Sequence, residues 1–135
     1  MSLETKFING IQVFFDIEQT SNYRNETNQP CDCQWCRIYY ANIDKNTELT
    51  KFLSEFGIDY NYSEEIFSFE LNEDKTLVHH ICCYHVIGKI NGEDFSLEKY
   101  GVKITFEQGE SFPPKQKPEF FWIKIETDFP YMIDK

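Results

Sequence analysis

Apolar and polar residues divide this chain into a first hairpin, a helical middle and a long run of strands. Residues 6–15 hold two apolar runs separated by Asn9-Gly10. Asn-Gly between apolar runs is a strong hairpin signal, because both turn positions favour positive φ. Residues 18–30 are polar and end at Pro30, so they are predicted to form a loop.

Two helices are predicted after this loop. The first runs from Cys33 to about Ile43, where apolar residues recur at spacings of three and four. The second begins at Asn46 or Thr47, either of which can cap it, and ends at Gly57, which supplies a left-handed stop. Its apolar stripe consists of Leu49, Phe52, Leu53 and Phe56.

The rest of the chain has the alternating pattern of strands, predicted at Ile66–Leu71, Thr76–Ile90, Phe95–Leu97, Val102–Glu107 and Phe120–Glu126. Segregated helices and strands predict an α+β domain with an antiparallel sheet of five or six strands. The two helices, inserted after the first hairpin, are expected to pack on one face. At 135 residues the chain fits a single domain, 1–135.

The apolar faces of these elements define a predicted core. Each buried aromatic ring removes roughly 150–250 Å² from water, so few rings can fill a core of this size. The residues expected to be almost wholly buried are Phe52, Phe56, Ile81, Ile104 and Ile123.

The net charge of the chain favours some classes of binding partner over others. With 13 basic and 23 acidic residues, the net charge is −10, and the acidic residues are spread along the chain. This field repels phosphate backbones, which disfavours nucleic acid and favours a basic protein partner. Residues 1–15 lack an apolar stretch of signal-peptide length, and the apolar clusters elsewhere are strand-sized. A cytoplasmic location without membrane contact is therefore predicted, where thiols stay reduced.

A cysteine cluster is the main candidate for chemistry. Cys33 and Cys36 stand three residues apart, which places both thiols on one face of a helix's first turn, and Cys31 lies just before it. Three thiolates near a helix N-terminus could hold a soft metal such as zinc. Cys83 or His85, on one face of the long predicted strand, would supply the fourth ligand. The alternative is that the cysteines are reduced and pack as small hydrophobes.

Two catalytic alternatives are less favoured. Cys33 and Cys36 could exchange disulfides, but Asp32 before the first thiol would raise the thiolate pKa, and no βαβ unit surrounds the pair. Cys83 could act as a nucleophile with a nearby histidine, but no sequence signal marks an oxyanion hole or an elbow. The sequence therefore favours a protein that is not an enzyme.

Four segments carry a resemblance to a known group. They are Cys31-x-Cys33-x2-Cys36-Arg37, Phe52-Leu53-x2-Phe56-Gly57-Ile58-Asp59, Tyr84-His85-Val86-Ile87-Gly88 and Phe129-Pro130-Tyr131-x-Ile133-Asp134. Together they resemble small bacterial proteins of unknown function with a C-x-C-x2-C-[KR] helix start and a Tyr-His strand. Tyr131 stands where the group has Trp. The resemblance implies a shared site for the cluster and the strand, and no activity or substrate.

These observations lead to two functional hypotheses. The first is a non-enzymatic protein-binding module, an antagonist of a basic protein such as a toxin. The alternative is an enzyme that uses cysteine thiols or a bound zinc. An exposed aromatic patch with acidic residues at its rim would favour the first. A concave pocket converging on Cys83, His85 or Cys33 would favour the second.

Overall fold

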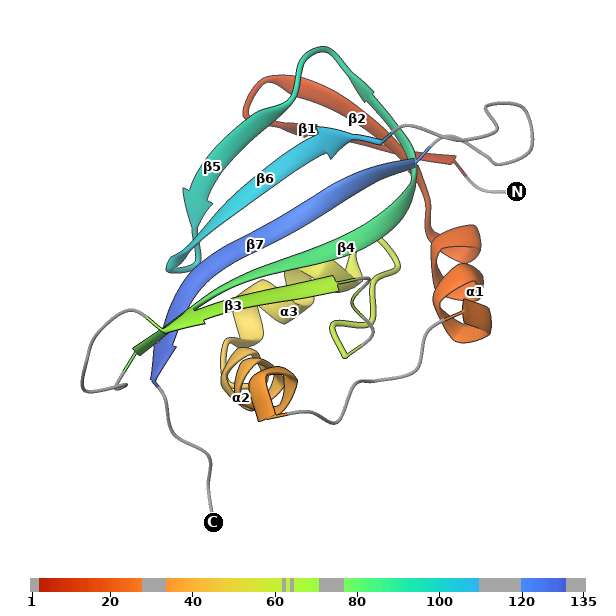
Figure 1. The fold of residues 1–135 in the computed structure, drawn as a ribbon. Coiled ribbons are helices and arrows are strands. Elements are labelled where there is room, and N and C mark those ends of the chain that lie inside the picture. Colours follow the sequence, from red (N-terminus) through yellow and green to blue (C-terminus); the bar gives the residue numbers. More distant parts are fainter. Residues whose placement is uncertain are drawn as a thin grey trace.

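The fold is a curved antiparallel sheet with helices on one side (Figure 1). The computed structural model describes residues 3–27, 34–61, 63, 65–70, 77–109 and 120–130. Within these ranges lie the strands β1 (Leu3–Ile8), β2 (Ile11–Asp16), β3 (Glu65–Glu70), β4 (Leu77–Asn91), β5 (Phe95–Lys99), β6 (Val102–Gln108) and β7 (Phe120–Pro130). The helices are α1 (Ile17–Thr27), α2 (Gln34–Ile43) and α3 (Thr47–Ser54). The α+β class is confirmed, with seven strands and three helices in the described part instead of five or six strands and two helices.

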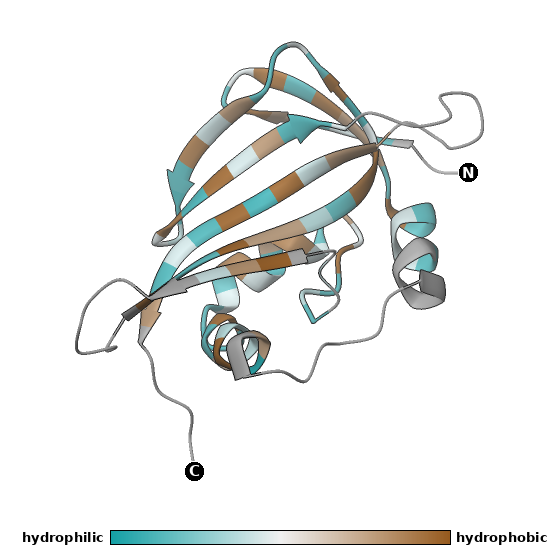
Figure 2. Cartoon of the chain, viewed as in Figure 1, coloured by the Kyte–Doolittle hydropathy of each residue, from teal (hydrophilic) through white to brown (hydrophobic). Residues whose placement is uncertain are grey.

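The core lies between the sheet and the helices α2 and α3. We call the sheet face that packs on them the inner face and the opposite one the outer face. Figure 2 shows hydrophobic and hydrophilic positions alternating along β6 and β7, as expected for a sheet with one covered face. Phe52, Phe56, Ile104 and Ile123 are buried there, as predicted. Ile81 is only partly buried, so its prediction was wrong, because strand alternation points it to the outer face.

The long strand β4 organises the sheet, whose order is β1-β2-β4-β7-β6-β5. Along one edge, β4 pairs first with β3 and then with β2, antiparallel to both. In the gap between these partners, the Ile87 N–H donates to Thr20 Oγ1 of α1 at 3.0 Å. Next to it, a Cβ on Gly88 would lie 2.0 Å from the Phe14 carbonyl oxygen, so the close approach of β2 requires glycine.

The predicted turn and cap signals are confirmed. Asn9 and Gly10 have φ of 53° and 80°, the conformation that an Asn-Gly hairpin turn needs. Asn46 caps α3, because its side-chain oxygen accepts a hydrogen bond from the Leu49 N–H at 3.2 Å. Gly57 has a φ of 87°, as expected for the stop after this helix.

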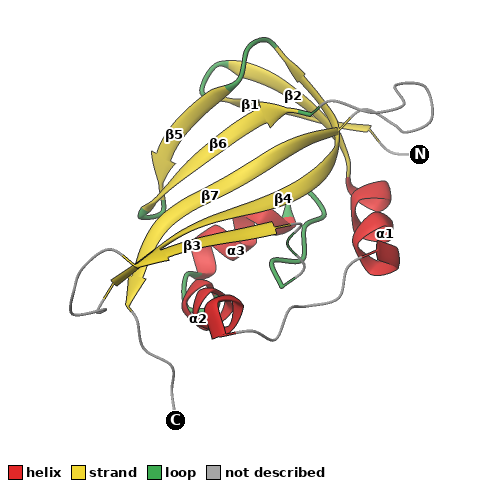
Figure 3. Ribbon diagram, viewed as in Figure 1, coloured by secondary structure: helices red, strands yellow, loops and turns green. Residues whose placement is uncertain are grey.

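The predicted loop over residues 18–30 was wrong, because α1 occupies Ile17–Thr27 (Figure 3). Asp16 caps this helix: its carboxylate accepts hydrogen bonds from the Gln19 N–H at 2.8 Å and from Gln19 Nε2 at 3.0 Å. An acidic residue followed three positions later by Gln is a helix-start signal that the sequence does contain. This signal did not lead to a helix prediction, because α1 is polar and lacks a continuous apolar stripe. None of the helices in the described ranges is long and apolar enough to cross a membrane.

Candidate binding surface on the outer face of the sheet

The outer face carries large apolar side chains that the described helices leave uncovered. Phe7 is 73% exposed and Phe67 is 45% exposed. Strand register places five further apolar side chains on the same face, all partly exposed except Ile87: Phe14, Ile81, Ile87, Phe120 and Trp122. Large exposed apolar groups gathered on one face are typical of an interaction surface.

An aromatic cluster lies on this face where the start of β7 pairs with β4. The His85 ring stacks on Phe120 with centroids 4.4 Å apart and meets Trp122 edge-on at 5.5 Å. Phe120 and Trp122 are themselves 5.3 Å apart at nearly perpendicular planes. His85 is only 6% exposed although it lies on the outer face, and its ring takes part in this aromatic packing.

Charged residues border the apolar side chains. On β6 and β7, Glu107 and Lys124 form an ion pair at 2.5 Å, and this contact raises the Lys124 pKa. At one end of the sheet, strands β4 to β7 and the β5–β6 turn surround an open pocket of about 740 Å³. Its charged lining residues are His79, Glu98, Lys99, Lys103, Glu126 and Asp128.

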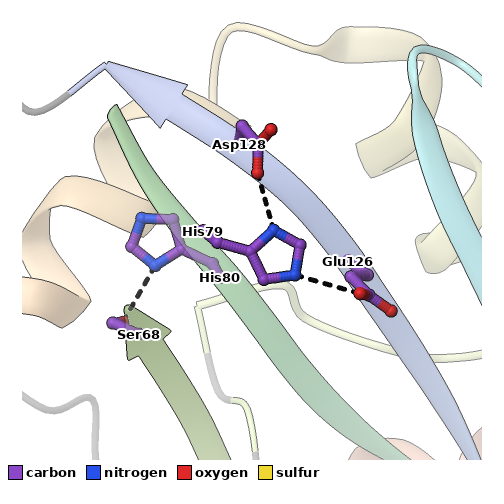
Figure 4. A network of polar contacts seen from close by, with 5 residues as sticks. All are labelled: Ser68, His79, His80, Glu126 and Asp128. Carbon is purple, nitrogen blue, oxygen red and sulfur yellow. Dashed lines mark hydrogen bonds and ion pairs between the residues drawn. The ribbon is translucent and has the colours of Figure 1, made fainter. Parts of the chain in front are cut away.

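His79 is held between two carboxylates of β7 (Figure 4). Its Nδ1 lies 2.6 Å from Asp128 Oδ1, and its Nε2 lies 3.0 Å from Glu126 Oε2. The hydrogen bond with Asp128 raises the His79 pKa most strongly, and the Glu126 contact adds to this, while partial burial opposes it. The charged imidazolium is the form that donates to both carboxylates.

His80 has the opposite environment on the inner face. Its Nδ1 lies 3.0 Å from Ser68 Oγ, and its ring sits 5.6 Å from Tyr39 and 5.7 Å from Phe129. Nε2 is buried and has no hydrogen-bond partner among the described residues. Burial, together with the nearby charge of His79, lowers the His80 pKa to about 4. His80 is therefore neutral at neutral pH.

A buried polar cluster joins α2 to β4. The Tyr84 hydroxyl donates to the Tyr60 carbonyl at 2.8 Å, so the Tyr39 hydroxyl donates to Tyr84 at 3.0 Å. Burial raises the pKa of both phenols well above the usual value and raises that of the neighbouring Cys82 thiol to about 12. These groups stay protonated at neutral pH and stabilise the helix–sheet contact.

The predicted zinc ligands are distributed over both sides of β4. Cys31 and Cys33 lie outside the described residues. Cys36 is buried on α2, which packs on the inner face, whereas Cys83 and His85 share the outer face, as their spacing predicted. Within the described ranges, no three Cys, His, Asp or Glu side chains are grouped to hold a metal ion. The zinc site formed by this set stays a prediction.

Metal analysis of protein purified without chelator tests that prediction. The zinc hypothesis predicts one equivalent of zinc per chain, lost in Cys33→Ser but kept in the control Cys82→Ala, because Cys82 is outside the predicted set. Substoichiometric zinc, together with five titratable thiols, would show instead that the cysteines serve packing.

Comparisons of this chain with protein-family models, with curated proteins and with solved structures found no match. The carboxylates around His79 were not among the site residues predicted from the sequence. The signal available was the alternation of Lys124, Glu126 and Asp128 on β7, which places all three side chains on one face.

Proposed function

We propose that this chain is a non-enzymatic protein-binding module that binds a basic partner protein through the outer face of its sheet. One observation carries the proposal: exposed aromatic side chains share that face with a rim of carboxylates. Phe67 lies opposite Ile81 on β4, and the next residue along that row is Glu126 of β7. Apolar and acidic side chains thus lie next to one another on neighbouring strands of one surface.

The aromatic residues supply the area for binding. Phe and Trp rings each bury roughly 150–250 Å² on contact, and residues of this kind often dominate the binding energy of an interface. Phe67 on β3 and Trp122 on β7 are both accessible to solvent, and these two strands flank β4 on opposite sides. A partner with a complementary apolar surface would remove both rings from water.

The charge selects the kind of partner. A net charge of −10 attracts basic proteins at long range and speeds their association at low salt. A basic toxin that this chain antagonises fits such a role. The alternative, an enzyme using thiols or zinc, has its support in the cysteine spacing. Of the thiols in the described part, Cys82 is a poor nucleophile, because burial raises its pKa to about 12.

The test is affinity capture from the native host at low salt, followed by binding measurements with each purified basic protein that is recovered. Phe67→Ser is expected to weaken binding roughly tenfold or more, as for other aromatic residues central to an interface. The matched control is Ile17→Ser, since Ile17 is similarly exposed at 37% but lies on α1. Rising salt should weaken binding mainly by slowing association.

Two results would contradict the proposal. One is that Phe67→Ser and Ile17→Ser have equal effects on every recovered partner, which would place the binding surface elsewhere. The other is that no basic protein is recovered at low salt, which would leave an enzyme or a sensor as the function.

A further inference from the structure

The pocket at the end of the outer face gathers ionisable groups from four strands. His79 comes from β4, Glu126 and Asp128 from β7, Lys103 from β6, and Glu98 and Lys99 from β5. On the remaining side of β4, the residue opposite His79 is Phe69 of β3, which does not titrate. His79 is therefore the group in this pocket whose charge changes near neutral pH.

The proton on His79 decides the balance of charge in the pocket. On the outer face, His79 and Lys103 lie together with the carboxylates of Glu98, Glu126 and Asp128, whereas the register places Lys99 beside Val102 on the inner face. When His79 loses its proton, the excess of negative charge in this group rises from one to two. Deprotonation thus makes the pocket more strongly anionic, and an anionic pocket attracts a cationic side chain.

The geometry of His79 couples this proton to the position of the carboxylates. Each ring nitrogen faces one carboxylate oxygen, at 2.6 Å for Asp128 and 3.0 Å for Glu126. A neutral imidazole has a single N–H, so it donates to only one of them. The other nitrogen would then present its lone pair to a carboxylate, which is repulsive, and that carboxylate turns away toward the pocket.

We propose that His79 is a proton-controlled gate for this pocket: when deprotonated, it releases a carboxylate that binds an arginine side chain of the basic partner. When protonated, the imidazolium holds both carboxylates and competes with that arginine. This inference rests on the proposed function and identifies an arginine as one residue through which the partner binds. Arginine fits best because its planar guanidinium binds carboxylates through two parallel hydrogen bonds and stays charged throughout this pH range.

The electrostatic environment shifts the gate to a pH above the ordinary histidine value. The hydrogen bond with Asp128 raises the His79 pKa above its ordinary value. The side chain is 25% exposed, so a proton and a ligand can both reach it. Binding through this pocket should therefore tighten as the pH rises through the His79 pKa.

The test measures binding of a fluorescent hexa-arginine peptide by anisotropy at about pH 5.5 and about pH 9, on either side of the ordinary histidine pKa of about 6.5. For the wild type, affinity should increase roughly twofold to fivefold at the higher pH, as for one exposed charge pair. His79→Gln should bind tightly at both pH values, because its side chain is always neutral. His79→Lys should bind weakly at both. Glu48→Gln, on the surface of α3, should keep the wild-type pH dependence.

A second measurement follows the His79 ring by NMR without peptide. Its titration midpoint should lie above the ordinary value of about 6.5 and should fall in Asp128→Asn. A wild-type pH dependence that persists in His79→Gln, or a midpoint at or below the ordinary value, would overturn the gate while leaving the partner surface at Phe67 intact. Failure of the peptide to bind at either pH would also overturn the gate. The Phe67→Ser comparison then decides separately whether the proposed function fails.

Discussion

Replacing Phe56 with Ala is expected to lower the free energy of unfolding by about 3–5 kcal/mol, the usual cost of truncating a packed ring. The Phe56 side chain is fully buried where α3 meets the sheet. Its ring lies 4.6 Å from Phe15, 5.3 Å from Phe52 and 5.9 Å from Phe106. The neighbours come from β2, α3 and β6, so they cannot collapse together into the space that the ring leaves.

Urea denaturation followed by circular dichroism measures this effect. The matched control is Phe67→Ala, the same truncation on the outer face, where the ring is 45% exposed. Its effect on stability should be within about 0.5 kcal/mol, as for surface substitutions away from packed regions. Because a domain of this size has a stability of about 5–15 kcal/mol, Phe56→Ala removes a large part of it. Equal losses in the two variants would mean that Phe56 does not fill the core.

Acidification is expected to destabilise the protein through His80. Its pKa is lowered to about 4 in the folded state, while an unfolded chain has the ordinary value of about 6.5. At pH values between these two pKa values, the unfolded state binds a proton that the folded state does not bind, so the free energy of unfolding decreases as the pH falls. The difference between the two pKa values corresponds to a loss of about 3 kcal/mol, which is complete once the pH is near 4. His79 acts in the opposite sense, since its raised pKa favours the folded state until the pH rises through that pKa.

The measurement is urea denaturation at pH values from about 4 to about 8, comparing the wild type with His80→Phe. The phenyl ring fits between Tyr39 and Phe129, which already flank the imidazole, and it cannot bind a proton. The variant should therefore lose less stability than the wild type between about pH 6.5 and about pH 4. Carboxylates contribute to acid denaturation in both proteins, so the difference between the two curves isolates His80. Parallel curves would show that His80 is not held neutral in the core.

Local sequence signals determined much of the secondary structure. Asn9-Gly10 predicted its turn, because few other dipeptides tolerate positive φ at both positions. Asn46 and Gly57 marked the ends of α3, since capping and left-handed stops depend on neighbouring residues alone. Alternation also separated the two faces of β4 correctly. Asp16 also marked the start of α1, but the polar composition of this helix led to the prediction of a loop.

Tertiary structure decided which face of each strand is covered. Alternation groups Ile81 with Cys83 and His85, but it does not say which group meets the helices. The helices pack on the other face, so Ile81 is partly exposed and Cys36 lies across the sheet from Cys83 and His85.

The sequence by itself determined the α+β class, the acidic charge and the positions of most elements, because these depend on composition and on contacts within a few residues. The site at His79 depended on tertiary structure, because Asp128 is 49 residues away and meets it only through the register of β4 and β7. The same holds for His80, whose pKa is set by burial against Tyr39 and Phe129. Adjacent histidines thus acquire opposite protonation behaviour because a strand points them to opposite faces of the sheet.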